Sequence, residues 1–275
     1  MKPNVICLLV RLSCLLALTT LSCARAAPRH AAPVLLFRGA GTSPNDVQAV
    51  ATILQKCDID YETANSEELN RMSEARLRKY RLLIMPGGNF IEMGKGLPTE
   101  TPAKIRRTVE GGLNYLGICG GALLAGDGDD NNLNLTSGVR FDFYSAVNDG
   151  VHKAAVPITR VDGPAIEHYW EDGPQFSGWG TVIVKYPDGT PAVVQGRCGK
   201  GWMILCGTHP EAPESWREGM SFTTSVAESN AYAQKLINAA LHGTELPHFL
   251  SEGRAAKVSR PRAEDGEPGP AAAPW

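Results

Sequence analysis

Cys119 lies in a motif that could position a thiol nucleophile. The motif Gly117-Ile118-Cys119-Gly120-Gly121 follows an apolar stretch and precedes small residues that favour a helix. A nucleophile on a tight turn between a strand and a helix needs glycines beside it, because larger side chains would clash. Gly117 and Gly121 meet that need. The helix N-terminus would add unpaired N–H groups and partial positive charge, which favour a thiolate and can hold an oxyanion.

The triplet His209-Pro210-Glu211 could supply a base for this nucleophile. A carboxylate that accepts the second ring N–H of a histidine fixes the tautomer and orientation of the imidazole. Residues two apart on an extended segment point the same way, and Pro210 stiffens the link. An isolated His-x-Glu is usually structural, but together with a glycine-flanked cysteine it predicts a Cys119–His209–Glu211 triad.

Other residues are candidates for the oxyanion or substrate site. Backbone N–H groups near Gly87, Gly88 and Gly120 could bind an oxyanion, although Pro86-Gly87-Gly88 could equally be a turn that ends a strand. Asn89 could line the pocket or lie on a surface loop. Tyr169, within His168-Tyr169-Trp170, could contact a ligand, and packing explains these aromatic residues about as well.

Strand and helix patterns alternate in the first half of the chain. Short apolar runs predict strands, and cap residues followed by helically spaced apolar residues predict helices. Strands are expected at 34–37, 60–64, 82–85 and 114–118, and helices are expected to begin at 43–46 and 66–69 and to cover 102–110. The last of these strands delivers Cys119 to the carboxyl edge of a parallel sheet, where such sheets place their ligands.

The second half of the chain has a different pattern. Short β-like runs separated by Gly, Pro and Asp predict antiparallel additions. These runs lie at 155–161, 181–186, 192–196 and 202–206, and a final helix is expected at 225–241. The fold class predicted is therefore α/β, a flavodoxin-like and mostly parallel sheet flanked by helices, with antiparallel strands added in the second half.

The first 26 residues have the features of a signal peptide. Lys2 and Arg11 precede the apolar run Leu12–Leu21, and Ala24-Arg25-Ala26 fits a cleavage site. The run is short for a membrane-spanning helix. We therefore expect a periplasmic or secreted protein. A lipoprotein motif that ends at Cys23 is the weaker alternative, and membrane association is expected only if Cys23 is acylated.

Composition and residue spacing limit the partners, cofactors and domains that can be expected. The net charge of −2 comes from scattered residues, so no nucleic-acid partner is indicated. Four cysteines follow the signal peptide, too few for a disulfide scaffold. The histidines lack the spacing of metal ligands, so neither a metal nor another cofactor is expected. One domain is predicted over 33–245, with a disordered tail over 254–275.

These motifs resemble the class I glutamine amidotransferase-like superfamily. The resemblance rests on Gly-Ile-Cys-Gly-Gly after a strand, a Pro-Gly-Gly turn one strand earlier and a late His-Pro-Glu. Within the superfamily, the chain is most similar to the N-terminal domain of biotin-protein ligases and its stand-alone bacterial relatives. The resemblance implies a nucleophilic Cys119, a base His209, an orienting Glu211 and an oxyanion site near Gly88 and Gly120. Glutamine amidotransferases usually carry glutamine where this chain has Leu123, which argues against glutamine as substrate.

Three functions are compatible with the sequence. The first is an exported cysteine hydrolase that acts on amide, peptide or γ-glutamyl-like bonds in a small-molecule or peptide substrate. The second is a non-catalytic module that binds or senses a small ligand. The third, by analogy with another branch of the superfamily, is a redox sensor that acts through oxidation of Cys119. The sequence leaves the oligomeric state open.

Overall fold

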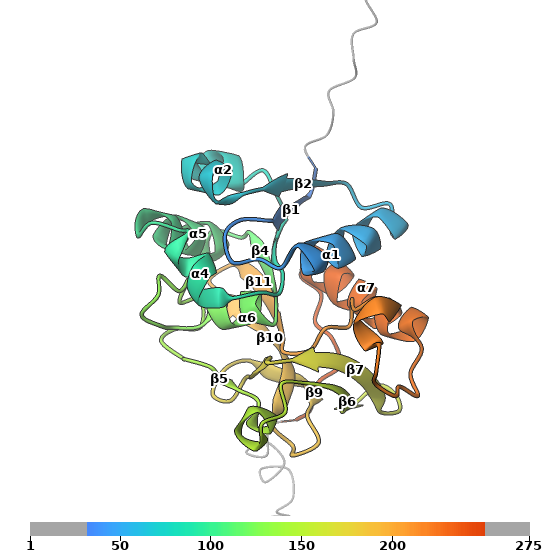
Figure 1. Cartoon of the computed structure of the whole chain (residues 1–275). Coiled ribbons are helices and arrows are strands. Elements are labelled where there is room, and N and C mark those ends of the chain that lie inside the picture. The colour runs from blue at the N-terminus through green and yellow to red at the C-terminus, as the bar shows by residue number, and fades with distance from the viewer. Residues whose placement is uncertain (1–31, 251–275) are drawn as a thin grey trace, which may run out of the picture. The chain divides into compact units, whose positions relative to one another are not determined.

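The computed structural model describes residues 32–250, which Figure 1 shows with helices and strands labelled. The signal peptide predicted over 1–26 and the tail predicted over 254–275 lie outside the described residues. Within 32–250, no helix combines the length and the hydrophobicity needed to span a membrane. Cys57, Cys119, Cys198 and Cys206 are all free thiols in this part of the chain.

The described strands form one large mixed sheet in the order β2-β1-β3-β4-β11-β10-β9-β6-β7. Its first five strands are parallel. They are β2 (Tyr61–Ala64), β1 (Val34–Phe37), β3 (Leu82–Met85), β4 (Asn114–Ile118) and β11 (Gly201–Cys206). With β11 as the fifth strand of this half, the order is the 2-1-3-4-5 of flavodoxin-like folds. The predicted flavodoxin-like α/β fold is thus confirmed.

The rest of the large sheet is antiparallel, as the turn-rich second half of the sequence predicted. These strands are β10 (Pro191–Cys198), β9 (Thr181–Lys185), β6 (Lys153–Arg160) and β7 (Ile166–Glu171). A separate short pair joins β5 (Asp142–Phe143) to β8 (Pro174–Gln175). The sequence did not predict β7 as a strand, because its run of consecutive buried side chains lacks a clear alternation.

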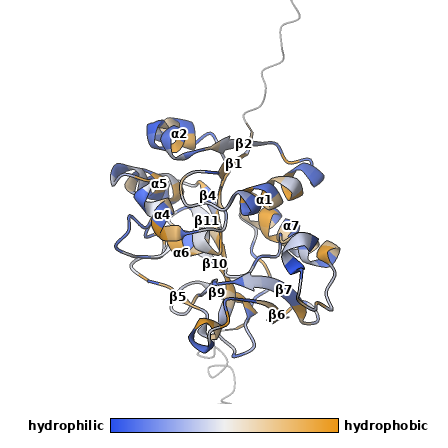
Figure 2. Cartoon of the chain, viewed as in Figure 1, coloured by the Kyte–Doolittle hydropathy of each residue, from blue (hydrophilic) through white to orange (hydrophobic). Residues whose placement is uncertain are grey.

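Helices cover both faces of the parallel strands (Figure 1). Side chains alternate along each strand, so Leu36 and Ile84 join one core while Leu35 and Leu83 join the other. The first core also contains residues of α1 (Pro44–Lys56) and α7 (Val226–His242). The second contains residues of α2 (Ser66–Arg71), α3 (Glu74–Leu77), α4 (Phe90–Lys95), α5 (Glu100–Glu110) and α6 (Gly120–Ala125). Two 3-10 turns, η1 (Ser145–Asp149) and η2 (Glu214–Arg217), complete the elements. In Figure 2, α1 and α2 combine hydrophilic and hydrophobic residues, as expected for helices that pack one face on a sheet.

Several chain segments meet at the carboxyl edge of the parallel strands. The segments that follow β1, β3, β4 and β11 all leave the sheet at this edge, because parallel strands end on the same side. The end of β7 also reaches it, since the His209 N–H donates to the Tyr169 carbonyl at 2.8 Å. β7, the last strand in the sheet order, therefore contacts the segment that follows β11.

Close packing between α6 and β3 makes Gly121 a sensitive position. A Cβ atom at Gly121 would lie 2.0 Å from the Met85 carbonyl oxygen, which is backbone and cannot rotate away. We expect Gly121→Ala to destabilise the protein by about 1–3 kcal/mol, the usual effect of overpacking. Gly163→Ala is the matched control, because only the end of the Arg160 side chain lies within 4 Å there. Equal urea-unfolding midpoints for the two variants would contradict this prediction.

Candidate active site

Cys119 occupies a strained turn between β4 and α6. Its φ of 48° and ψ of −111° are unusual for a residue other than glycine, and such strain costs on the order of 1–3 kcal/mol. The Cys119 N–H donates to the Cys206 carbonyl at 2.8 Å, which ties the turn to β11. The side chain lies at the first turn of α6 and is almost buried, with 7% exposed. This is the geometry that the motif predicted for a nucleophile.

The glycines of the motif allow close backbone approach. A Cβ atom at Gly117 would lie 2.7 Å from the Gly121 carbonyl oxygen, and one at Gly120 would lie 2.0 Å from the Gly88 carbonyl oxygen. Both contacts are shorter than a Cβ atom tolerates. The motif therefore lets α6 begin directly against β4 and against the turn after β3.

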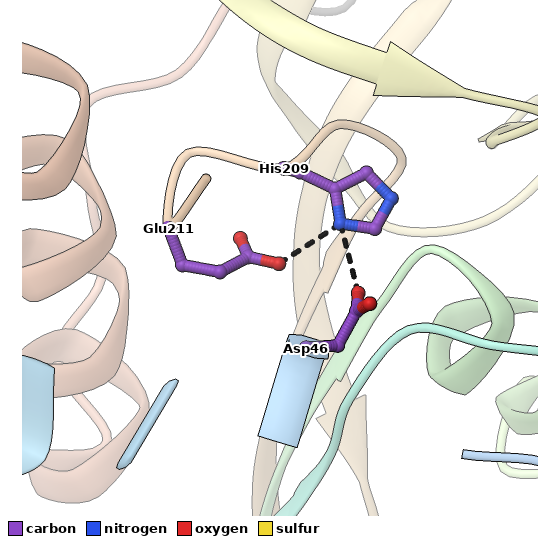
Figure 3. A group of neighbouring side chains, drawn as sticks. All are labelled: Asp46, His209 and Glu211. Atoms are coloured by element: carbon purple, nitrogen blue, oxygen red, sulfur yellow. Dashed lines mark hydrogen bonds and ion pairs between the residues drawn. The ribbon is translucent and has the colours of Figure 1, made fainter. Parts of the chain in front are cut away.

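His209 and Glu211 form the hydrogen bond that their spacing predicted. Nδ1 of His209 lies 2.9 Å from Oε1 of Glu211, and both side chains are buried (Figure 3). Since Nδ1 faces the carboxylate, the other ring nitrogen, Nε2, is the one left to exchange a proton with a nucleophile. Cys119 and His209 line the same cavity, and the charge of Cys119 acts to raise the pKa of His209.

Asp46 is a functional candidate that the sequence reasoning missed. Its Oδ1 lies 3.1 Å from the same Nδ1 atom of His209, so two carboxylates flank one imidazole nitrogen (Figure 3). The sequence indicated only that Asp46 begins a helix, which is a common place for an acid. Its place shortly after β1 could have indicated a functional role, because the segment that follows β1 leaves the sheet at the same edge as His209.

Gly87 makes room for this group of side chains. A Cβ atom at Gly87 would lie 2.0 Å from Oδ1 of Asp46 and 2.8 Å from Cε1 of His209. The structure thus gives Gly87 a packing reason to be glycine beside the imidazole.

The buried side chains of His209, Glu211 and Asp46 shift one another's pKa values. Burial alone would lower the pKa of His209, but Cys119, Glu211 and Asp46 outweigh it and raise that pKa well above its ordinary value. Burial raises the pKa of Glu211, with His209 opposing it. Burial also acts to raise the pKa of Asp46, but the hydrogen bond and charge of His209 prevail and lower it. Of the two carboxylates, Asp46 therefore keeps its negative charge to lower pH.

The same three side chains could also hold a metal ion. Asp46, His209 and Glu211 bring one nitrogen and two carboxylate oxygens within 4.8 Å of one another, all buried. Imidazole and carboxylate are ligands that divalent transition metals accept. A metal there would occupy Nδ1 and remove the hydrogen bond that orients the ring.

A cavity of about 570 Å³ opens onto Cys119 and His209. We call it the Cys119 cavity. Of the candidate residues from the sequence, Gly88, Asn89 and Gly120 line it, together with Asp46. Within the described residues, the N–H groups of Gly88 and Gly120 donate no hydrogen bond, so both are free to bind an oxyanion. The Asn89 side chain instead accepts the N–H groups of Ile91 and Glu92, both at 3.1 Å, and caps α4.

Tyr169 lies beside the Cys119 cavity without lining it. Its hydroxyl donates to Glu171 at 2.6 Å, and its ring lies 5.8 Å from that of His209. It lines a neighbouring hollow instead. Its neighbours His168 and Trp170 are both fully buried and belong to the core. Burial lowers the pKa of His168 to about 3.

Removing the charge of Asp46 should weaken the fold in a limited pH range. The raised pKa of His209 contributes stability fully below its unfolded value, near 6.5, and this contribution is lost as the pH rises through the folded pKa. The lowered pKa of Asp46 contributes above its unfolded value of 3.8 and is lost as the pH falls through its folded pKa.

We therefore expect Asp46→Asn to lower the free energy of unfolding by about 1 kcal/mol, because it removes the charge that pairs with His209 and a pKa shift of about one unit corresponds to this energy. The deficit should be largest between about pH 4 and pH 6.5, where both contributions to stability are fully present. Urea unfolding at pH 5.5 and pH 9 measures it, with the exposed Asp129→Asn as control. A deficit that is the same at both pH values would contradict the prediction.

The sheet order and the cysteine between a strand and a helix define the fold class. The chain has the class I glutamine amidotransferase-like fold. More particularly, residues 32–151 match the family described as biotin-protein ligase, N terminal.

Solved structures of known proteins share this fold. A glutamine amidotransferase is similar over 76% of this chain and 98% of its own, with a TM-score of 0.55 and 19% identity. The exo-β-1,4-mannosidase Op5Man5 from Opitutaceae bacterium strain TAV5 is similar over 74% of this chain but only 35% of its own, with a TM-score of 0.50 and 15% identity. At these identities the likeness concerns the fold alone. No curated protein sequence gives a significant match.

Proposed function

We propose that this protein is an exported cysteine-dependent hydrolase of amide, peptide or γ-glutamyl-like bonds. The observation that carries the proposal is a strained Cys119 at the start of α6, beside a buried His209 whose Nδ1 is held by Glu211 at 2.9 Å. A thiol, an imidazole and a carboxylate in this relation are the parts of a nucleophilic triad.

Each group has a defined part in the proposed reaction. His209 holds the proton of the Cys119 thiol on Nε2, and the thiolate attacks the carbonyl carbon of the substrate. The N–H groups of Gly88 and Gly120 stabilise the oxyanion. The imidazolium then protonates the leaving amine, an acyl-enzyme remains on sulfur, and water activated by His209 releases the acid. Glu211 orients the ring, and Asp46 adds negative charge that favours the imidazolium.

The residues near the nucleophile do not favour glutamine itself. Leu123 lines the Cys119 cavity at the place where the resemblance to glutamine amidotransferases leads one to expect glutamine. An apolar side chain there cannot hydrogen-bond a polar substrate. We therefore propose a different amide, peptide or γ-glutamyl-like bond as the substrate.

Export is part of the proposal and rests on the sequence. Lys2 and Arg11, the apolar run Leu12–Leu21 and the Ala24-Arg25-Ala26 site support a cleaved signal peptide and a periplasmic or secreted product. Acylation at Cys23 would instead anchor it to a membrane. Intact-mass measurement of the protein from the native host distinguishes the products, because cleavage after Ala26 and acylation at Cys23 give different N-termini.

Trapping of the acyl-enzyme tests the reaction. The mature protein is incubated with a library of amides and γ-glutamyl compounds, quenched in acid and examined for a mass increase on the peptide that contains Cys119. We expect an adduct with some of these compounds and none with Cys119→Ala. Added chelator should leave the adduct unchanged, because no step uses the possible metal site. Failure of all compounds to acylate Cys119 would contradict the proposal.

One contact favours the alternative of a non-catalytic binding module. The Cys119 Sγ lies 3.4 Å from the Glu171 carbonyl oxygen, a contact that suits a protonated thiol acting as donor rather than a thiolate. In that case a small ligand would occupy the cavity without being cleaved. A compound that raises the melting temperature of both the parent protein and Cys119→Ala, with no turnover by the parent, would favour this function.

A further inference from the structure

The Cys119 cavity has two walls of different chemistry. An apolar wall consists of Phe90, Ile91, Leu123 and Phe143. Phe143 is 45% exposed, although its ring packs edge-on against that of Phe90 with the centroids 6.4 Å apart. The acidic wall consists of Asp46, Glu171 and Asp172. Among the described residues that line the cavity, His209 is the only basic side chain.

The acidic wall is held close to the nucleophile. Glu171 ends β7, and its carbonyl oxygen lies 3.4 Å from the Cys119 Sγ. The Tyr169 hydroxyl donates to the Glu171 carboxylate at 2.6 Å, which restrains that side chain. Asp172 follows the strand with a positive φ of 44°, which lies outside the β region.

The basic groups around the acidic wall balance its negative charge only in part. Asp46 is already paired with the buried His209. Asp172 pairs with His152 at 2.9 Å, but this pair is largely exposed and water screens it. No basic side chain lies within ion-pair distance of Glu171 in the described residues. Lys153 lies opposite Glu171 across β6 and β7 without forming an ion pair with it, and both residues line the neighbouring hollow together with Glu218.

We infer that the substrate carries a positively charged group, such as a protonated amine, close to the bond that is cleaved, and that Glu171 and Asp172 bind this group. The inference rests on the proposed function and specifies its substrate class. A cation near these carboxylates is attracted, whereas an anion is repelled and must also approach the buried negative charge of Asp46. The apolar wall leaves room for a hydrophobic portion of the same molecule.

Thiol reagents that differ in charge test this inference without knowledge of the substrate. The trimethylammonium-ethyl, methyl and sulfonatoethyl methanethiosulfonates are cationic, neutral and anionic. In each case the Cys119 thiolate attacks the divalent sulfur, a new S–S bond forms, and methanesulfinate leaves with the electrons of the broken S–S bond. Peptide mass spectrometry gives the rate at Cys119 apart from that at the partly exposed Cys57.

We expect the cationic reagent to modify Cys119 about tenfold or more faster than the anionic one, after division by the same ratio for N-acetylcysteine. The preference should fall as salt is raised from 20 mM to 500 mM, because salt screens the interaction. The double variant Glu171→Gln, Asp172→Asn should remove most of it. Glutamine keeps an acceptor for the Tyr169 hydroxyl, and asparagine tolerates the positive φ of Asp172. Asp129→Asn, an exposed acid outside the cavity, should keep the full preference.

Three negative results have different meanings. If Cys119 reacts rapidly with the neutral reagent but shows the same charge ratio as N-acetylcysteine, the inferred cationic substrate is wrong and the proposed hydrolase stands. If the ratio is high but unchanged in the double variant, Glu171 and Asp172 are not the groups that bind the charge. If none of the reagents modifies Cys119 faster than Cys57, the proposed nucleophile is itself wrong, and the inference fails with it.

Discussion

Replacing Cys119 with alanine should reduce turnover of any substrate by roughly 10³-fold or more while the protein stays folded. In the proposed mechanism the sulfur is the atom that attacks the carbonyl, so its removal leaves no nucleophile at this position. Alanine removes only the thiol and its contact with the Glu171 carbonyl. Initial rates at saturating substrate measure the loss, and thermal unfolding shows whether the fold is retained.

A second cysteine variant separates catalysis from stability. Cys206→Ala removes another buried thiol, one that lies on β11 and does not line the Cys119 cavity. It should lower stability by leaving a small void but should retain most of the activity. If Cys119→Ala retained turnover within a few fold of the parent protein, the covalent mechanism would be wrong.

Replacing His209 with asparagine should have the next largest effect. We expect turnover to fall by about 10²–10⁴-fold, the usual contribution of a general acid and base. Asparagine can still accept or donate one hydrogen bond near Glu211, but it cannot take the thiol proton. The rate of Cys119 alkylation at pH 6.5 should therefore fall together with turnover.

The pH dependence of alkylation distinguishes this role from a structural one. The raised pKa of His209 favours the imidazolium, whose positive charge assists Cys119 in the proposed mechanism. The parent protein should therefore be alkylated faster than His209→Asn, and the difference in rate should be larger at pH 6 than at pH 9. In His209→Asn the rate should climb steadily toward pH 9, as it does for an unassisted thiol. Parallel pH profiles for the two proteins would indicate that His209 does not assist Cys119.

Much of the fold was predictable because local signals agreed with the tertiary structure. The apolar runs at Val34–Phe37, Leu82–Met85 and Asn114–Ile118 are strands, and Ser43 and Ser225 cap the helices that were expected after them. Each signal depends on neighbouring residues in the chain. The position of β7 depends instead on pairing with β6 and on the contact between Tyr169 and His209, which no local pattern encodes.

The parts of the candidate site that could be predicted are those in which residues close together in the sequence determine the local geometry. The glycines around Cys119 indicated the tight turn, and the spacing of His209 and Glu211 indicated their hydrogen bond. Asp46 was not predictable in this way, because an acid in the first turn of a helix already has a common explanation. Tyr169 was expected in the pocket, but β7 directs it into the neighbouring hollow.

Competitive labelling of the cysteines tests the central claim most directly, namely that His209 activates Cys119. The folded protein and His209→Asn are each treated with limiting iodoacetamide at pH 6.5, and peptide mass spectrometry compares Cys119 with Cys57. Burial and the charge of Asp58 raise the pKa of the Cys57 thiol, which makes it a slow internal reference. We predict that Cys119 reacts at least about tenfold faster than Cys57 in the parent protein and loses this advantage in His209→Asn. Equal rates at the two cysteines, or an advantage that persists without His209, would contradict the account.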